Sequence, residues 1–146
     1  MSDKASSTIV IGAAPEAVLA VIADLPAYPQ WASFMSDVQV LETYDDGRAK
    51  VARFTLDAGL IKDIYSVTYT WTQDSVRWSL VEGQMLKALD GEYSVRAVDG
   101  GTEVSYELEV DTAVPVIGLL KRKAEKVIID TALKGLKKRV ESGVPR

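Results

Sequence analysis

The chain of 146 residues contains neither cysteine nor histidine. The first absence excludes disulfides and thiol chemistry. The second removes the usual general base, the commonest metal ligand and every catalytic triad that depends on imidazole. No group of carboxylates has the spacing of a metal-binding loop, and no glycine-rich stretch has that of a phosphate-binding loop. We therefore expect no metal and no cofactor.

Long apolar runs and large basic blocks are also missing. No hydrophobic stretch approaches the roughly 20 residues of a membrane-spanning helix, and no apolar signal-peptide core follows the polar start MSDKASS. We expect a cytoplasmic protein without an integral membrane segment. The net charge is −4, and the one basic cluster, at 121–126 and 134–139, lies in a helical pattern. The solvated face of a helix explains this cluster more simply than a lipid-headgroup site, and nucleic acid is not an expected partner.

The remaining composition is that of a folded domain, with 47% hydrophobic and 26% charged residues. A chain of this length can bury a core of its own. We expect one domain over residues 1–146, with its core at about 8–141.

Strand and helix patterns follow one another in a simple order. A β-branched run at 8–11 predicts a first strand, and Pro15 with apolar residues at helical spacing predicts a short helix over 15–24. Two prolines stop that helix, and a further helical turn is expected around Trp31. From residue 37 the period changes to two, which predicts six antiparallel strands joined by short polar turns. Residues 116–141 return to a helical period.

The alternation within the strands indicates which side chains share a face. Pairing across the turns VDGG and TQDS places most of the large aromatic residues on the inner face: Tyr65, Tyr69, Trp71, Trp78, Tyr93 and Tyr106. The C-terminal helix has an apolar stripe that would meet this face: Leu120, Ala124, Val127, Ile128, Thr131 and Gly135. The small members of the stripe are compatible with close packing or with an empty space. If there is a space, Thr131→Leu or Gly135→Leu would fill it without strain, whereas a charge at Leu120 or Val127 would unfold the domain.

Two stretches carry a family resemblance. PEAVLAVIADLPAYPQW resembles the early P-x-x-V…D…YP-x-W stretch of the START-like helix-grip (SRPBCC) superfamily, and GTEVSYELEV…VP before a helix ending in LKKRVE resembles its closing strand and helix. The nearest group is the bacterial polyketide cyclase/dehydrase and lipid-transport group, which includes ubiquinone-binding relatives. The resemblance implies an α+β helix-grip fold: a curved antiparallel sheet of about seven strands wrapped around a long C-terminal helix, with two short helices between the first two strands. It also implies an elongated pocket between the sheet and that helix.

The resemblance and the inner face together give the expected ligand-binding residues: Trp31, Phe34, Tyr65, Tyr69, Trp78, Tyr93, Tyr106, Val127 and Thr131. Buried tyrosine hydroxyls need hydrogen-bond partners, which a pocket supplies more easily than a solid aromatic core. Trp31 is either a core plug or a ligand contact. Arg53 and Asp63 are possible polar pocket residues, although Arg53 faces outward unless a bulge reverses its strand, and a solvated strand end is the simpler place for Asp63.

The expected function is binding or transport of a hydrophobic or amphipathic small molecule: a lipid, an isoprenoid quinone or a polyketide-like aromatic. One alternative is a cofactor-independent polyketide cyclase or dehydratase that uses the same cavity, in which Tyr65, Tyr69 and Arg53 would stabilise an enolate and move a proton. Another is a protein-interaction or chaperone-like module. The sequence does not identify the ligand, a reaction or the oligomeric state.

Overall fold

The computed structural model describes residues 4–58, 61–113 and 118–142. The strands and helices in chain order are β1 (Ala5–Ile11), α1 (Pro15–Ala23), the 3₁₀ helix η1 (Leu25–Gln30), β2 (Met35–Thr43), β3 (Ala49–Ala58), β4 (Ile61–Trp71), β5 (Ser75–Glu82), β6 (Leu86–Val98), β7 (Gly101–Thr112) and α2 (Gly118–Glu141). All seven strands form one antiparallel sheet in the order β1-β7-β6-β5-β4-β3-β2. This arrangement confirms the predicted helix-grip fold. Within the described part of the chain, no helix is both long and apolar enough to span a bilayer.

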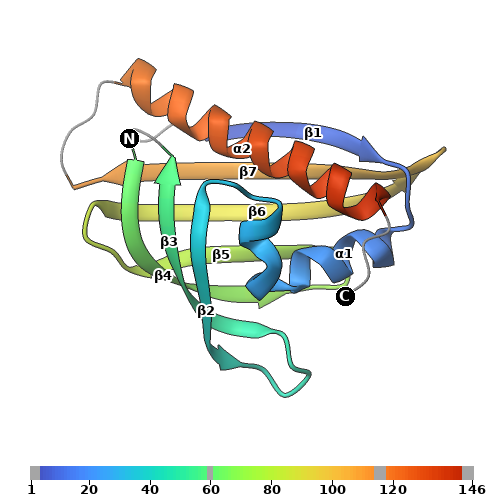
Figure 1. The fold of residues 1–146 in the computed structure, drawn as a ribbon, viewed down its shortest axis with the longest axis horizontal. Helices are drawn as coiled ribbons and strands as arrows, with labels where there is room; N and C mark the ends of the chain where they lie inside the picture. The colour runs from blue at the N-terminus through green and yellow to red at the C-terminus, as the bar shows by residue number, and fades with distance from the viewer. Residues whose placement is uncertain (1–3, 59–60, 114–117, 143–146) are drawn as a thin grey trace.

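The sheet curves strongly around α2. Figure 1 shows β2 and β3 running across the direction of β6 and β7, while α2 lies over one face of the sheet beside β1 and β7. α1 and η1 lie near the C-terminal end of α2 and connect the first strand, β1, to β2 at the opposite edge of the sheet. The concave face of the sheet is thereby covered by helices, and the core lies between these layers.

The predicted strand registers are confirmed. Tyr93 pairs with Tyr106 and Val95 with Val104 across the turn between β6 and β7, and Tyr69 pairs with Trp78 across the turn between β4 and β5. The burial of β7 alternates residue by residue, as its sequence pattern indicates. Short polar turns and the alternation of apolar residues both fix these registers. A slip by one residue would move each buried side chain to the solvent face.

The second short helix differs in detail from the prediction. η1 includes both Pro26 and Pro29 and ends at Gln30, before Trp31. Pro26 occupies the first turn of η1, where a missing N–H group loses no helical hydrogen bond. The hydroxyl of Tyr28 donates a hydrogen bond to the carbonyl oxygen of Ile22, which ties η1 back to α1.

The prediction of which face of α2 is buried is wrong: the helix is rotated about its axis relative to the predicted orientation. Leu120 and Val127 are 44% and 48% exposed. Their arc continues into Lys134 and Lys138, so burying it would also bury two lysines. The buried face instead comprises Ala124, Glu125, Ile128, Ile129, Ala132, Leu133 and Leu136.

One member of this buried face, Glu125, is an ionisable residue that the hydrophobic pattern did not indicate. Its Oε2 accepts a hydrogen bond of 3.0 Å from the backbone N–H of Val110. β1 begins at Ala5, opposite Leu108, so Val110 lies beyond the residues of β7 that pair with β1. The carboxylate thus serves as the acceptor for a strand N–H group at the point where the sheet pairing ends.

Candidate functional site

A small cavity lies between the concave face of the sheet, the segment that follows η1, and α2. Its volume is about 40 Å³, which is room for two or three water molecules. A larger ligand would therefore have to move side chains apart as it enters. The cavity is lined by Tyr28, Trp31, Ala32, Phe34, Met35, Phe54, Leu56, Tyr65, Tyr69, Trp78, Leu89, Tyr93, Tyr106, Leu108 and Ile128.

Seven of the nine residues expected from the sequence lie around this cavity: Trp31, Phe34, Tyr65, Tyr69, Trp78, Tyr93 and Tyr106. Val127 and Thr131 do not, because α2 is rotated and presents Ile128 to the cavity instead. Sequence reasoning also missed Tyr28 and Phe54. Tyr28 lies between the two prolines of η1, and Phe54 pairs with Tyr65, so the turn motif and the strand parity were the signals that could have located them.

Strand pairing gathers the aromatic residues into one continuous wall. The ring centroids of Tyr93 and Tyr106 are 4.5 Å apart, and those of Trp78 and Tyr93 are 5.4 Å apart. Trp78 fits into this wall because its strand partner is Gly91. A Cβ atom at Gly91 would lie 2.2 Å from the indole ring, so any other residue would displace Trp78.

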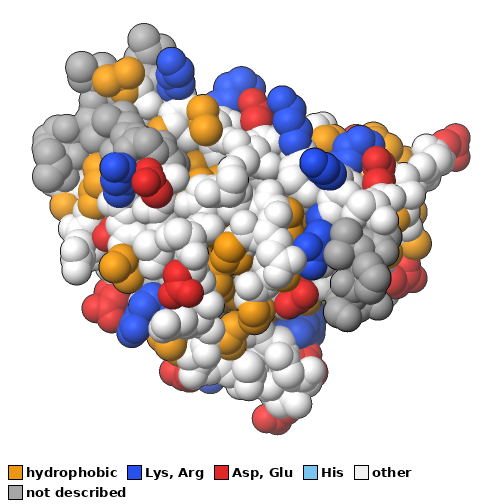
Figure 2. All heavy atoms as spheres, viewed as in Figure 1, with side chains coloured by type: hydrophobic (Ala, Val, Ile, Leu, Met, Phe, Trp, Pro, Cys, Tyr) orange, Lys and Arg blue, Asp and Glu red, His pale blue; other side chains and the backbone are white. Residues whose placement is uncertain are grey.

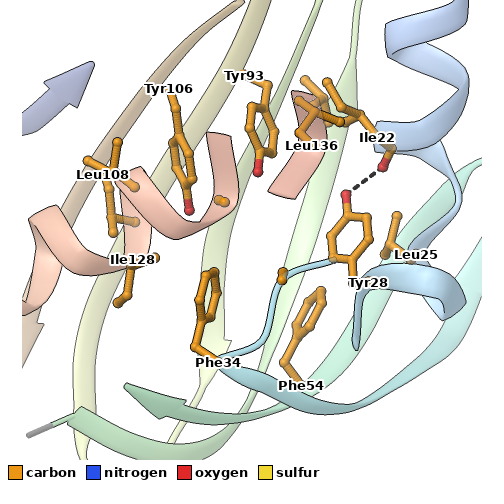
Figure 3. Close-up of a cluster of buried hydrophobic side chains, with 14 of the residues drawn as sticks. Ile22, Leu25, Tyr28, Phe34, Phe54, Tyr93, Tyr106, Leu108, Ile128 and Leu136 are labelled. Atoms are coloured by element: carbon orange, nitrogen blue, oxygen red, sulfur yellow. Dashed lines mark hydrogen bonds between the residues drawn. The ribbon is translucent and has the colours of Figure 1, made fainter. Parts of the chain in front are cut away.

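The cavity tyrosines differ in what their hydroxyls contact. Tyr28 is bonded to Ile22, whereas Tyr93 and Tyr106 lie side by side with their hydroxyls directed towards the space between α2 and Phe34 (Figure 3). In the part of the chain that the structure describes, the hydroxyls of Tyr65, Tyr69, Tyr93 and Tyr106 form no hydrogen bond. These four groups are available to a molecule in the cavity.

The electrostatics of the site keep these phenols neutral. Burial raises the pKa of Tyr65, Tyr69, Tyr93 and Tyr106 above the usual value, because a phenolate would lose its hydration. At physiological pH each hydroxyl can donate a hydrogen bond to an oxygen of a ligand. None of them would be ionised and ready to take up a proton.

Trp31 contributes a further donor. The residue is only 8% exposed, and its indole Nε1 has no hydrogen-bond partner among the residues that are described. Its ring packs edge-on against Tyr28, with centroids 4.9 Å apart. A buried N–H group without an acceptor costs free energy, and an acceptor in the cavity could recover that cost.

The two charged candidates lie outside the cavity. Arg53 is exposed on the convex side of β3, because Ala52 and Phe54 face inward and no bulge reverses this part of the strand. Asp63 is buried, but its carboxylate accepts hydrogen bonds from backbone N–H groups of the loop between β5 and β6 and of the first residue of β6. Arg53 therefore lies on the surface, which was the simpler expectation, whereas Asp63 is buried rather than solvated, and neither residue lines the cavity.

The resulting wall consists of apolar, aromatic and neutral polar side chains. Among the described residues, no Asp, Glu, Lys or Arg lines the cavity, and no three potential ligands come together to hold a metal. The wall can exclude water, stack against a ring system and donate hydrogen bonds. It offers no charged group for an ion pair and no carboxylate to act as a general base.

Comparisons with known proteins agree with this architecture. The family model described as polyketide cyclase/dehydrase and lipid transport matches residues 2–141. A START superfamily protein from Mycobacterium smegmatis superimposes with a TM-score of 0.88 at 22% identity, covering 97% of this chain and 99% of the other. The Zhui aromatase/cyclase from a Streptomyces species superimposes with a TM-score of 0.82 at 14% identity, covering 99% of this chain and 97% of the other. A STAR-related lipid transfer protein from Xanthomonas axonopodis superimposes with a TM-score of 0.74 at 17% identity, covering 94% of this chain and 85% of the other. A search of curated protein sequences finds no match.

Proposed function

Because the chain belongs to the polyketide cyclase/dehydrase and lipid transport family, we propose that it binds an uncharged, largely apolar small molecule in the cavity between the sheet and α2. The composition of the cavity wall carries this proposal. Aromatic and aliphatic side chains supply the contact area, and a few neutral polar groups supply orientation, which is the usual composition of a small-molecule site.

The polar groups of the wall narrow the class of ligand. Four tyrosine hydroxyls and the indole N–H of Trp31 can all donate hydrogen bonds, so the fitting ligand carries acceptor oxygens such as ketone, quinone or phenol oxygens. A fatty-acid carboxylate fits less well, because the desolvation of an anion that has no cation nearby costs on the order of several kcal/mol. Among the candidates, a polyketide-like aromatic or a quinone therefore suits the wall better than a free fatty acid.

Binding is better supported than turnover. A cyclase needs a donor that stabilises an enolate and a second group that moves a proton. The phenols could serve as the donors, which is the specific observation in favour of a cyclase. The second group has no candidate in the wall, since Arg53 faces solvent and Asp63 is bonded to a loop.

Three naphthalene-sized probes test the ligand class by equilibrium dialysis. Menadione is neutral with two acceptor oxygens, methylnaphthalene has the same ring system without acceptors, and naphthoate is an anion. The chain has no thiol that menadione could alkylate. We expect menadione to bind more tightly than either of the others. If none of the three binds, and native mass spectrometry of freshly purified protein finds no bound molecule, the proposed function is wrong.

Removal of one hydroxyl tests the orientation of the ligand. Tyr93→Phe or Tyr106→Phe should weaken menadione binding by about fivefold, the effect of one hydrogen bond, and leave methylnaphthalene binding unchanged. Tyr28→Phe is the matched control, because that hydroxyl also lies at the cavity but is bonded to Ile22. Equal losses in all three variants would contradict the assignment of the free hydroxyls to the ligand.

A further inference from the structure

The charges of the chain are divided unequally between α2 and the remainder. α2 contains eight of the 17 Lys and Arg residues and three of the 21 Asp and Glu residues, which gives the helix a formal charge of +5. The rest of the chain therefore carries −9, although the whole carries only −4. Figure 2 shows Lys and Arg side chains following the course of α2 across the molecule.

The exposed face of α2 combines positive charge with apolar surface. Leu120, Lys123, Val127, Lys134 and Lys138 are all exposed and recur at intervals of three, four and seven residues, so they form one stripe along the helix. We call these five residues the lysine stripe. Lys126 and Lys137, in contrast, have acidic partners on the helix, at Asp130 and Glu141. Within residues 4–58, 61–113 and 118–142, the three lysines of the stripe form no ion pair.

Helix stability does not explain this arrangement. Lys121, Arg122 and Lys123 lie within the first six residues of α2, where the helix has no acidic residue in its first turn. The N-terminal end of a helix carries partial positive charge, which disfavours cations there. Leu120 and Val127 leave apolar surface in water without contributing to the core. Lys138, in contrast, lies in the last turn of α2, where a cation is favourable, so this cost falls on the N-terminal part of the helix.

From these observations we propose that the lysine stripe docks onto the surface of an anionic lipid bilayer. Clustered lysines are attracted to anionic headgroups, and their aliphatic stems can lie along the interface while the charges remain in water. Leu120 and Val127 would enter the boundary between headgroups and acyl chains, as the apolar face of an interfacial helix does. The negative phosphates of a nucleic acid would also attract the three lysines, but a nucleic acid has no apolar layer to receive the two aliphatic side chains.

The position of the remaining charge supports this orientation. Acidic residues of β7, including Glu107 and Glu109, alternate with the buried ones and so lie on the convex face of the sheet, away from α2. Docking through α2 would keep this face away from the anionic surface. It would also bring the cavity close to the bilayer, because Ile128 lines the cavity next to Val127 on the same helix. The docking itself does not depend on which ligand the cavity holds.

Vesicle flotation with the ligand-free protein tests the proposal. The vesicles contain either phosphatidylcholine alone or two parts phosphatidylcholine to one part phosphatidylglycerol. We expect the protein to float only with the anionic vesicles, and more strongly at about 10 mM than at about 150 mM salt, since salt screens exposed charges. Absence of flotation with anionic vesicles at low salt, or equal flotation with both vesicles, would overturn the proposal.

Charge-matched variants locate the surface. Lys123→Gln, Lys134→Gln and Lys138→Gln together should lower the partition coefficient by about 100-fold, because each lysine near an anionic membrane adds about a fivefold attraction. The control combines Arg53→Gln, Lys62→Gln and Lys87→Gln, which removes the same charge from exposed positions on the sheet. The control variant should bind like the parent. Equal losses in the two variants would show that net charge alone governs binding and would overturn the docking face.

Two further measurements separate a bilayer from another polyanion. Leu120→Gln with Val127→Gln should lower flotation at about 150 mM salt more than at about 10 mM, where electrostatic attraction suffices. An effect of the apolar pair that is equal at both salt concentrations, or absent, would contradict its insertion. Tighter binding to a DNA oligonucleotide or to polyglutamate than to the anionic vesicles would assign the stripe to a macromolecular partner and overturn the proposal.

Discussion

Asp63 is a buried carboxylate with a structural role at the end of β4. Its Oδ2 accepts hydrogen bonds from the backbone N–H groups of Gln84, Met85 and Leu86, at 2.9 to 3.0 Å. Gly83 precedes this group, and a Cβ atom there would lie 2.8 Å from the same carboxylate oxygen. A single side chain therefore satisfies N–H groups of the loop between β5 and β6 and of the first residue of β6.

Replacing Asp63 should destabilise the domain strongly. We expect Asp63→Ala to lower the free energy of unfolding by about 3 kcal/mol, because it removes charge-assisted hydrogen bonds and leaves amide groups unsatisfied. Asp37→Ala, at an exposed position of β2, should change it by less than about 0.5 kcal/mol. Urea denaturation of both variants measures the difference. Similar stabilities for the two would show that the loop finds other acceptors.

At the scale of the element, α2 shows why a helical face is harder to predict than a strand face. Ile128 is buried and Val127 exposed, although both belong to the apolar arc of the sequence. A strand has two faces, so its parity decides burial, whereas adjacent helix positions differ by about 100° and the arc permits several rotations. Lys134 and Lys138 continue the arc of Val127, and the observed rotation leaves both lysines in water, where their charges are hydrated.

The two neighbouring positions provide a direct test of this rotation. Ile128→Asp should destabilise the domain by about 4 kcal/mol or more, because it buries an unpaired charge beside the cavity. Val127→Asp should cost less than about 1 kcal/mol, since its side chain is already half in water. Thermal unfolding followed by circular dichroism measures both. If only the Val127 variant unfolded, α2 would instead have the orientation predicted from the sequence, with Val127 buried.

Gly135 marks the place where α2 packs against the end of η1. A Cβ atom at this position would lie 1.9 Å from the carbonyl oxygen of Trp31, so the expectation that a larger residue fits here without strain is wrong. We expect Gly135→Ala to lower the free energy of unfolding by about 2 kcal/mol, despite the gain of about 1 kcal/mol in helix propensity. Lys134→Ala, at the exposed neighbouring position, is the control. A stabilised Gly135→Ala variant would mean that α2 and η1 can move apart.

At the scale of the molecule, the sequence predicted the parts of the structure that local chemistry determines. Prolines located the end of α1, polar turns set the strand registers, and alternation identified the aromatic wall. Features that depend on how separate elements meet were not predictable in this way. The burial of Glu125 against Val110 of β7 and the contact of Asp63 with a distant loop both arise from tertiary packing, which has no periodic signal in the sequence.

The burial of five of the six tyrosines should make the whole domain unfold in alkaline solution. The folded protein holds the pKa of Tyr28, Tyr65, Tyr69, Tyr93 and Tyr106 above the usual value of about 10, mainly because burial disfavours the phenolate. Their contribution to stability is fully present below the unfolded-state pKa of about 10 and is lost as the pH rises above it, because only the unfolded chain then releases these protons.

Each such tyrosine lowers the free energy of unfolding by about 1.4 kcal/mol per pH unit once the pH is well above 10. We therefore expect phenolate absorbance and the loss of circular dichroism to rise together in one cooperative transition. Tyr93→Phe isolates a single group from the lysines that titrate in the same range, and it should reduce the slope of stability against pH by that amount. A gradual rise of phenolate absorbance near pH 10 with the circular dichroism unchanged would show instead that solvent reaches the cavity tyrosines in the folded protein.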